Sequence, residues 1–475
     1  MPRSLIFFMH LSVLLLAGCM VGPDPKAPVL PELDAGFAGA ASGGNSPAVD
    51  VRWWERLGDP VLNGVVEEAV GGNFDLAIAI ERIKEARALR GEARAALFPA
   101  LTGRTDYTDI GISETQNAAV NPIVAFGGPI PNRVESWTTG LDASWEVDVF
   151  GGTRRRAQAA RFREEAATER ANGVRLSLVA DVVDAYYTLA GLRGQRGRIR
   201  ENVERQRTTT ELVSRLHREG LRSELDLRRA KAQLAATQAV EPPVTASITA
   251  QLRRLSLLLG CKPGSVEAMA PGFRGFPARL PVAAAGLPAD LVMRRPDLRE
   301  AERNLAAATS DIGVATAAFY PRFILLGSPQ LTSGSSADLF NANSLSWRAG
   351  PRVEWSLFRG GANKAVLAAA NSKERQVMLG FEKSVLNAVG EVESNLATLQ
   401  AETLRLHFLE TSVSETRASV DLSAKLYREG LEDLVTVLLE QQRLIATQLE
   451  EVSSRTSLVA AWIRLHKSLG GGWDR

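Results

Sequence analysis

Two halves of this sequence carry the same series of segments, and this duplication limits the fold more than any other feature. The first half contains Asn73-Phe74-Asp75-Leu76, and the second contains Arg295-Pro296-Asp297-Leu298, 222 residues later (297 minus 75). Similarly, Arg218-Glu219-Gly220-Leu221 returns as Arg428-Glu429-Gly430-Leu431 after 210 residues (430 minus 220). Further landmarks recur in the same order, so chance similarity between helices does not explain the pattern. Each half is expected to fold as helix, strand, loop, strand, very long helix, tight turn and long helix.

The duplication also predicts where the chain divides. We expect a first repeat at residues 57–262 and a second at residues 287–470, joined by a Pro/Gly-rich linker at residues 263–286. An extended segment rich in Pro, Gly and Ser precedes the repeats. The remaining segments are a signal peptide at residues 1–18, the extended N-terminal segment at residues 19–56, and a C-terminal tail at residues 471–475.

The N-terminus has the pattern of a bacterial lipoprotein signal. Arg3 precedes an apolar run, too short to span a bilayer, that ends in Leu16-Ala17-Gly18-Cys19. We therefore expect cleavage before Cys19, an S-diacylglycerol group on its thiol and an N-palmitoyl group on its amine. Two or more acyl chains anchor a protein stably. Met20, in place of Asp, favours the outer membrane. The alternative is an ordinary secretory signal that happens to contain a cysteine.

Alternation of apolar and polar residues predicts two-sided strands in both halves. The longer ones match the length of tilted membrane strands, and tryptophans near their ends are candidates for the membrane interface. A soluble β-sandwich would show similar alternation. The four strands are expected at about residues 101–110, 136–150, 322–331 and 345–358. The candidate membrane-interface aromatics are Trp137, Trp145, Trp347 and Trp355.

Four strands cannot close a barrel by themselves. An open sheet edge in lipid would leave backbone N–H and C=O groups without partners. We therefore expect the strands of several copies of the chain to join into one barrel.

Two segments without proline, residues 152–217 and 361–427, predict unusually long helices. At about 1.5 Å per residue, each would extend roughly 100 Å. Both contain a narrow seam at alternating spacings of four and three, which is typical of a coiled coil. A solvated bundle or a filamentous coiled coil would show the same seam. Together with strands that form a barrel, these helices are expected to line a tunnel. The seam residues include Ile199, Val203, Gln206, Thr210 and Val213, and Leu409, Val413, Thr416, Val420, Ser423 and Tyr427.

Each long helix is expected to end in a hairpin tip, at residues 217–222 and 427–432. Gly220 and Gly430 follow the last helical residues, where glycine commonly ends a helix in a left-handed conformation.

The sequence offers no catalytic, metal or nucleic-acid chemistry. The net charge is +2, so neither nucleic-acid binding nor electrostatic adsorption to a membrane is indicated. His217, His407 and His466 are scattered without metal-ligand spacing, and no phosphate-binding loop or nucleophile motif is present. We expect no enzyme activity, and no cofactor other than the covalent lipid on Cys19.

These segments resemble the TolC family of outer-membrane factors, in particular OprM-like, NodT-type lipoproteins of resistance-nodulation-division (RND) efflux systems. The resemblance covers nearly the whole mature chain. It is carried by Trp53-Trp54, Asp59-Pro60-Val61-Leu62, Trp145 to Gly151, Arg294 to Leu298, Ala301-Glu302, Phe319-Tyr320-Pro321, Phe358 with Gly360-Gly361, and Tyr427 to Gly430.

The resemblance implies a mostly α-helical protein that forms a homotrimer. Four strands per chain would give a 12-stranded β-barrel in the outer membrane, continuing into an α-helical coiled-coil tunnel in the periplasm. The implied function is a passive exit duct for drugs or other small toxic compounds. The implied partners are outer-membrane lipid, a periplasmic adapter (membrane fusion) protein and an inner-membrane RND-type pump. The adapter would dock at Arg218, Glu219, Gly220 and Leu221 and at Arg428, Glu429, Gly430 and Leu431.

Two alternative functions remain, and the sequence departs from the family at one position. The chain could serve type I protein secretion, or could be a periplasmic coiled-coil scaffold lipoprotein. Related proteins commonly carry an Asp on the helix after the second tip, where it helps to close the periplasmic aperture, but here Leu439 occupies that position, followed by Glu440. Glu432 and Asp433 are further candidates for the gate, although acids at a helix start also simply stabilise the helix dipole.

Overall fold

The computed structural model describes residues 20–32, 36–37, 51–113, 115, 133–269, 272–281, 291 and 294–473. The predicted signal peptide and Cys19 lie outside the described residues, as does most of the loop at residues 112–132. The chain forms two compact units, each taking matching parts from both repeats. The sheet unit comprises Met1–Pro28, Lys84–Glu165 and Glu302–Leu379, and the hairpin unit comprises Val29–Ile83, Ala166–Ala301 and Gly380–Arg475.

The predicted duplication is visible in the lengths and positions of the elements. Helices α3 (Phe74–Ala95) and α10 (Pro296–Ala317) each contain 22 residues. Strands β1 (Ala100–Gly111) and β3 (Arg322–Ser333) each contain 12 residues. Helices α5 (Gly152–Arg218) and α11 (Ala362–Arg428) each contain 67 residues. The first two pairs keep the 222-residue displacement and the third keeps 210, so the internal duplication is confirmed.

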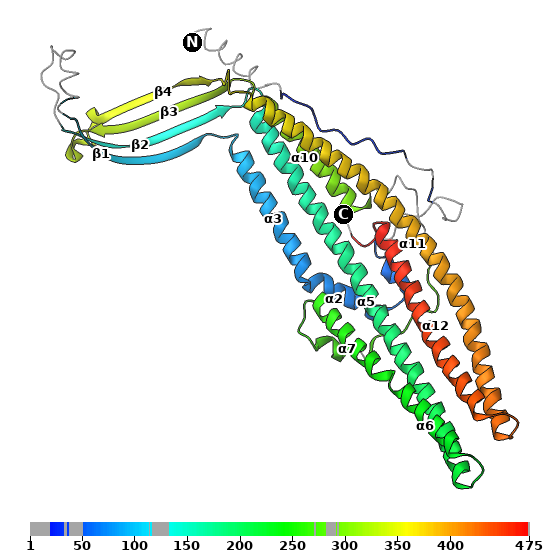
Figure 1. The fold of residues 1–475 in the computed structure, drawn as a ribbon. Helices are drawn as coiled ribbons and strands as arrows, with labels where there is room; N and C mark the ends of the chain where they lie inside the picture. The colour runs from blue at the N-terminus through cyan, green and yellow to red at the C-terminus, as the bar shows by residue number, and fades with distance from the viewer. Residues whose placement is uncertain are drawn as a thin grey trace, which may run out of the picture. The chain divides into compact units, whose positions relative to one another are not determined.

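The four strands form one antiparallel sheet in the order β1-β2-β3-β4 (Figure 1), with β2 at Arg133–Val147 and β4 at Leu345–Glu354. Strands β1 and β4 are therefore its edges. The register pairs Trp137 with Tyr107, whose ring centroids lie 4.5 Å apart, and pairs Trp347 with Pro329. As predicted, Trp137, Trp145 and Trp347 share one face of the sheet, and Trp355 follows the end of β4. Charged pairs such as Arg104–Asp106 occupy the opposite face.

Three predicted strand ends are wrong. Strand β2 begins at Arg133, which bonds across the sheet to Asp109, and stops at Val147 because Asp148 turns away to cap α5. The Asp148 carboxylate accepts hydrogen bonds from the backbone N–H of Thr153 and Arg154, at 3.0 and 2.8 Å. Strand β4 stops at Glu354 rather than 358, because its partner β3 begins at the opposing residue, Arg322.

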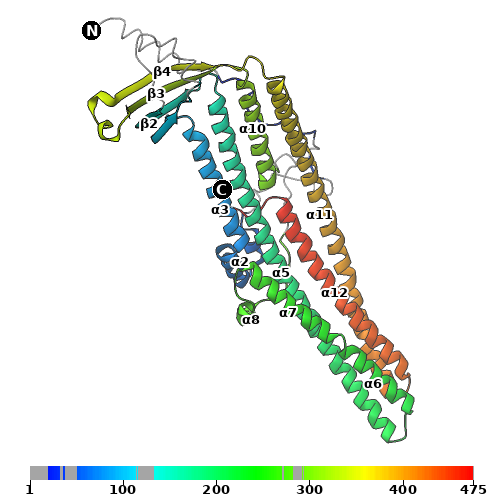
Figure 2. The ribbon, with the colours of Figure 1, turned by 60° about the vertical axis from the view of Figure 1, so that its left-hand side comes forward.

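The hairpin unit is built around the lower parts of α5 and α11. Helix α6 (Glu224–Gln238) follows the first tip and lies beside α5, and α12 (Leu434–Ser468) follows the second tip and lies beside α11 (Figures 1 and 2). A break separates α6 from the next helix. It falls at Ala239-Val240, and Pro242 and Pro243 lie in the first turn of α7 (Glu241–Leu258), where a missing N–H is tolerated.

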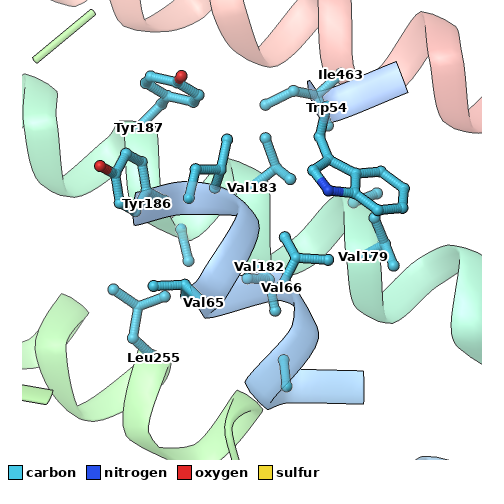
Figure 3. Packing of buried hydrophobic residues seen from close by; sticks show 14 of the residues in the cluster. Trp54, Val65, Val66, Val179, Val182, Val183, Tyr186, Tyr187, Leu255 and Ile463 are labelled. Carbon is cyan, nitrogen blue, oxygen red and sulfur yellow. The ribbon is translucent and has the colours of Figure 1, made fainter. Parts of the chain in front are cut away.

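The main core of the hairpin unit joins segments that are far apart in the sequence. Side chains from η1 (Trp53–Leu57), α2 (Pro60–Gly72), α5, α7 and α12 pack together in it (Figure 3). Asp59 caps α2 and accepts a hydrogen bond of 2.6 Å from the Tyr186 hydroxyl, which itself accepts one of 2.8 Å from the Arg274 backbone N–H. This chain of bonds ties the linker between the repeats to α5.

The chain's C-terminal segment is fixed to the same unit. The Trp53 indole donates a hydrogen bond to the Gly471 carbonyl, at 3.1 Å, and the Trp473 indole donates one to the Arg294 carbonyl, at 3.2 Å. Residues 468–473 are consequently buried.

Three short elements complete the described chain: α8 (Ser265–Met269), η4 (Ser336–Asp338) and η5 (Ala342–Ser344). None of the helices in the described chain is both long and apolar enough to cross a membrane.

Candidate functional site

Both predicted hairpin tips are present, and they share one backbone geometry. The N–H of Gly220 donates to the His217 carbonyl at 3.0 Å, and that of Leu221 donates to the Leu216 carbonyl at 2.9 Å. This is the Schellman arrangement, which requires a left-handed residue after the helix. Gly220 has φ 75°. The second tip repeats these bonds and has φ 76° at Gly430.

The residues predicted for docking are all exposed at the tips. They form the same Arg-Glu-Gly-Leu series twice. Leu221 and Leu431 are 66% and 71% exposed, although the last position of a Schellman motif often packs against its own helix. Each tip therefore exposes a charged pair and an apolar side chain.

Different side chains cap the helices that leave the two tips. The Ser223 hydroxyl accepts a hydrogen bond from the Asp226 N–H at the start of α6. At the start of α12, the Asp433 carboxylate accepts hydrogen bonds from the backbone N–H and the hydroxyl of Thr436, at 2.8 and 3.0 Å. These bonds favour the ionised carboxylate and lower the pKa of Asp433.

The two tips are joined to each other by aromatic and apolar contacts. The Arg222 guanidinium of the first tip lies 4.7 Å from the centre of the Tyr427 ring at the end of α11. The Arg222 carbonyl in turn contacts His217 Nδ1 at 3.0 Å, which fixes the first turn. Tyr427 is buried, and burial raises the pKa of its hydroxyl. A small cluster surrounds it, made of Val213, Ala230, Tyr427, Leu434 and Val437.

Above the tips, polar side chains replace apolar ones between α5 and α12. Gln441 Nε2 donates to Thr209 Oγ1 at 2.9 Å, and Asn202 Nδ2 donates to Gln448 Oε1 at 2.6 Å. The amide group of Gln206 is buried without a hydrogen-bond partner among the described residues. The predicted seam is confirmed on α11, where Val413, Thr416 and Val420 are all buried, and its predicted polar member Gln206 is buried on α5.

The comparisons with known proteins assign the family. The family model described as outer membrane efflux protein matches residues 65–261 and 287–471, most of the chain. The chain belongs to the outer membrane efflux protein family. This confirms the family resemblance. The mostly helical chain with its four-stranded antiparallel sheet confirms the fold class inferred for the single chain, and the trimer stays a prediction.

Individual relatives match over nearly their whole length. Nodulation protein T of Rhizobium leguminosarum bv. trifolii is 30% identical over 467 residues, covering 97% of this chain and 96% of that protein. The pyoverdine export outer membrane protein OpmQ of Pseudomonas aeruginosa is 29% identical over 474 residues, covering 97% and 95%. The solved outer-membrane channel OprN is 31% identical with a TM-score of 0.87, covering 96% of this chain and all of that one.

Two of the four candidate interface tryptophans in this outer membrane efflux protein donate hydrogen bonds to backbone carbonyls outside the sheet. The Trp145 indole donates to the Leu97 carbonyl at 2.9 Å, and the Trp355 indole donates to the Phe319 carbonyl at 3.0 Å. Leu97 and Phe319 follow α3 and α10 at equivalent positions. Each indole therefore holds the foot of the sheet against the end of a helix. Contact of the four tryptophans with the membrane interface stays a prediction.

The structure places the candidate gate residues in two groups. Glu432 and Asp433 lie at the tip, where Glu432 accepts a 3.0 Å hydrogen bond from the Thr436 hydroxyl, so both acids act in starting α12. Leu439 is 57% exposed further along the helix, and Glu440 lies 3.3 Å from Arg443. Their part in a gate stays a prediction. Arg222, which sequence reasoning missed, makes one of the contacts that connect the tips. Within the described residues, no group of His, Cys, Asp and Glu could hold a metal ion.

Proposed function

We propose that this outer membrane efflux protein is the exit channel of a tripartite efflux pump, formed by three copies of the chain. The observation that carries the proposal is the open sheet. Edge strand β4 is exposed along its whole length, and an apolar face with tryptophans backs onto a charged one. Pairing of β4 in one copy with β1 in the next would satisfy both edges and give a 12-stranded barrel with no open edge.

The two faces of the sheet suit lipid outside and water inside. Leu141, Trp347 and Val353 on the apolar face are 46%, 74% and 59% exposed in the single chain. The opposite face carries ion pairs such as Arg322–Glu146 and the 2.5 Å hydrogen bond from Ser328 to Asp142. Barrel strands with an apolar exterior and a polar interior form water-filled channels.

The proposal includes a lipid anchor and two protein partners. Cys19 would carry the S-diacylglycerol and N-palmitoyl groups that hold the chain in the outer membrane. The exposed tips would dock a periplasmic adapter, and an inner-membrane RND-type transporter would drive export. The names of two relatives refer to pyoverdine export and to solvent efflux, so related ducts serve different small compounds. We assign drugs or other small toxic compounds, with no catalytic step in the channel.

Valine substitution at the tip glycines tests the docking assignment. At φ 75° and 76°, Gly220→Val and Gly430→Val are expected to strain each tip by about 1–2 kcal/mol, enough to lower the docked population roughly 5- to 30-fold. Export of a fluorescent substrate should fall while the trimer remains. The matched control is Gly390→Val in α11, where an added Cβ also meets no atom within 4 Å but the backbone is helical. Wild-type export by both tip variants would contradict docking at the tips.

A further inference from the structure

The first described residues of the chain are held against the sheet unit at the turn between β2 and α5. The Val21 N–H donates a hydrogen bond to the Phe150 carbonyl at 3.1 Å. A Cβ added to Gly151, whose φ is 78°, would lie 2.7 Å from Met20 Cγ, so the segment runs directly over this glycine. We call residues 20–24 the N-terminal segment and residues Phe150–Arg155 the first elbow. In Figure 1 the N-terminal segment is part of the dark-blue trace.

A buried arginine binds this segment. Arg155 is 1% exposed, and its guanidinium donates hydrogen bonds of 3.2 Å to the carbonyls of Val21 and Gly22. The same group forms an ion pair of 2.8 Å with Asp24, which is itself 78% exposed. A buried guanidinium is costly unless its donors are satisfied, so these contacts specify the position of the segment.

Helix α10 also packs against the N-terminal segment, and we call the place formed by α10 and the first elbow the seat of this segment. A Cβ on Gly22, which has φ 83°, would lie 2.5 Å from Gly313 Cα, and a Cβ on Gly313 would lie 2.8 Å from the Arg155 side chain. The segment, α10 and Arg155 therefore pack without room for a side chain at either glycine.

The second repeat provides an internal comparison. Its elbow, at Phe358–Ala365, has the same left-handed glycine, with φ 86° at Gly361, but Ala365 stands where the first elbow has Arg155. A Cβ added to Gly361 would meet no atom within 4 Å, and Phe358 is 89% exposed. The arginine and the seated segment thus occur together at one elbow and are both missing from this described part of the other.

An apolar surface lies beside the seat. The Phe150 ring stacks on Tyr320 with centroids 4.6 Å apart, and Phe323 lies 6.5 Å from Phe150. Tyr320 is 40% exposed, and Phe323 is the second residue of β3, at the foot of the sheet. Met20, which is joined by its peptide bond to the predicted lipid-bearing Cys19, lies against the same elbow.

We propose that the first elbow seats the N-terminal segment so that the acyl chains of Cys19 enter the membrane along Phe150, Tyr320 and Phe323, with Arg155 as the positioning residue. This inference rests on the lipid anchor in the proposed function. It adds one specific place at which the lipid meets the sheet, so the anchor is a fixed part of the channel wall rather than a flexible tether.

Photo-crosslinking of the mature lipoprotein in nanodiscs tests the seat. A palmitate that carries a diazirine is incorporated in cells, and crosslinked peptides are mapped by mass spectrometry. In the wild type, crosslinks should concentrate on Phe150, Tyr320 and Phe323. In Arg155→Met, that fraction should fall about tenfold and exchange of the Val21 amide hydrogen should accelerate about tenfold, because charge-assisted bonds are lost. The control is Arg163→Met, which removes an exposed arginine of the same helix that pairs with Asp311.

A second variant covers the case in which Arg155→Met fails to assemble. Gly22→Val blocks the seat from the segment side and alters no helix, so it should shift the crosslinks in the same way. Either assembled variant with a wild-type crosslink map and wild-type Val21 exchange overturns the proposal, as do wild-type crosslinks that favour Phe358. The mass of the N-terminal peptide that contains residue 19 separates failure of the lipid anchor from failure of the seat. If the lipid is missing, both the anchor and the seat are overturned. If the lipid is present but the crosslink map of an assembled variant matches that of the wild type, only the seat is overturned.

Discussion

Leu141→Arg should prevent the chain from accumulating as a trimer in the outer membrane. Leu141 lies on the apolar face of β2, opposite Gly103 of β1 and on the same face as Trp137 and Trp145. If this face contacts lipid, an arginine near the middle of the membrane costs about 2–4 kcal/mol in each chain. Three chains would carry the cost together. Size-exclusion chromatography with light scattering on outer-membrane extracts should show at least a tenfold loss of trimer, on the scale of about 1.4 kcal/mol per factor of ten.

Thr138→Arg is the matched control, since it adds the same side chain three residues earlier on the polar face. Thr138 lies opposite Asp106 in the register, so an arginine there gains a nearby carboxylate and faces water. The trimer should survive. Equal loss of trimer in both variants, or survival of both, would contradict the assignment of the two faces.

Trp53→Ala should destabilise the hairpin unit by about 3–5 kcal/mol, the usual range for removing a buried tryptophan. Trp53 is fully buried, and its ring lies 5.5 Å from that of Trp462 and 5.4 Å from that of His466. The substitution also leaves the Gly471 carbonyl without its indole donor, which removes one of the two indole hydrogen bonds that fix the C-terminal segment. Denaturant unfolding of the purified protein, followed by circular dichroism at the helix band, measures the effect.

Two companion variants separate packing from hydrogen bonding. Trp53→Phe keeps most of the apolar volume and loses the donor, so its effect should be smaller than that of Trp53→Ala. Leu257→Ala, on α7 of the same unit and 73% exposed, should change stability by less than about 0.5 kcal/mol. If the Trp53→Ala and Leu257→Ala proteins unfold at the same denaturant concentration, η1 is peripheral to the core.

The features that sequence reasoning predicted well are periodic or repeated. Alternation over Trp137 to Val147 fixes which side chains share a face, and a glycine after a long helix fixes each tip. The duplication then ties the two halves together, and α5 and α11 keep one displacement from end to end. These signals act over a few residues, or recur at a constant distance, so they can be read along the chain.

The features that it missed join residues without such spacing. Arg222 meets Tyr427 only because two hairpins pack side by side, and Asp59 meets Tyr186 only because α2 folds onto α5. Strand ends also depend on partners, as Asp148 shows by leaving β2 to cap α5. One missed residue did have a signal. Alignment of the repeats puts Arg155 opposite Ala365, and an arginine present at only one of two equivalent positions marks a place where the symmetry is broken.

Single-channel recording tests the central claim, that this outer membrane efflux protein forms a channel, most directly. Purified trimers are added to planar lipid bilayers under an applied voltage, and vesicle flotation confirms that the same preparation inserts into lipid. We expect discrete current steps from the wild type and none from the Leu141→Arg protein. Wild-type trimers that float with the vesicles but give no current steps at any voltage would contradict the assignment as a channel.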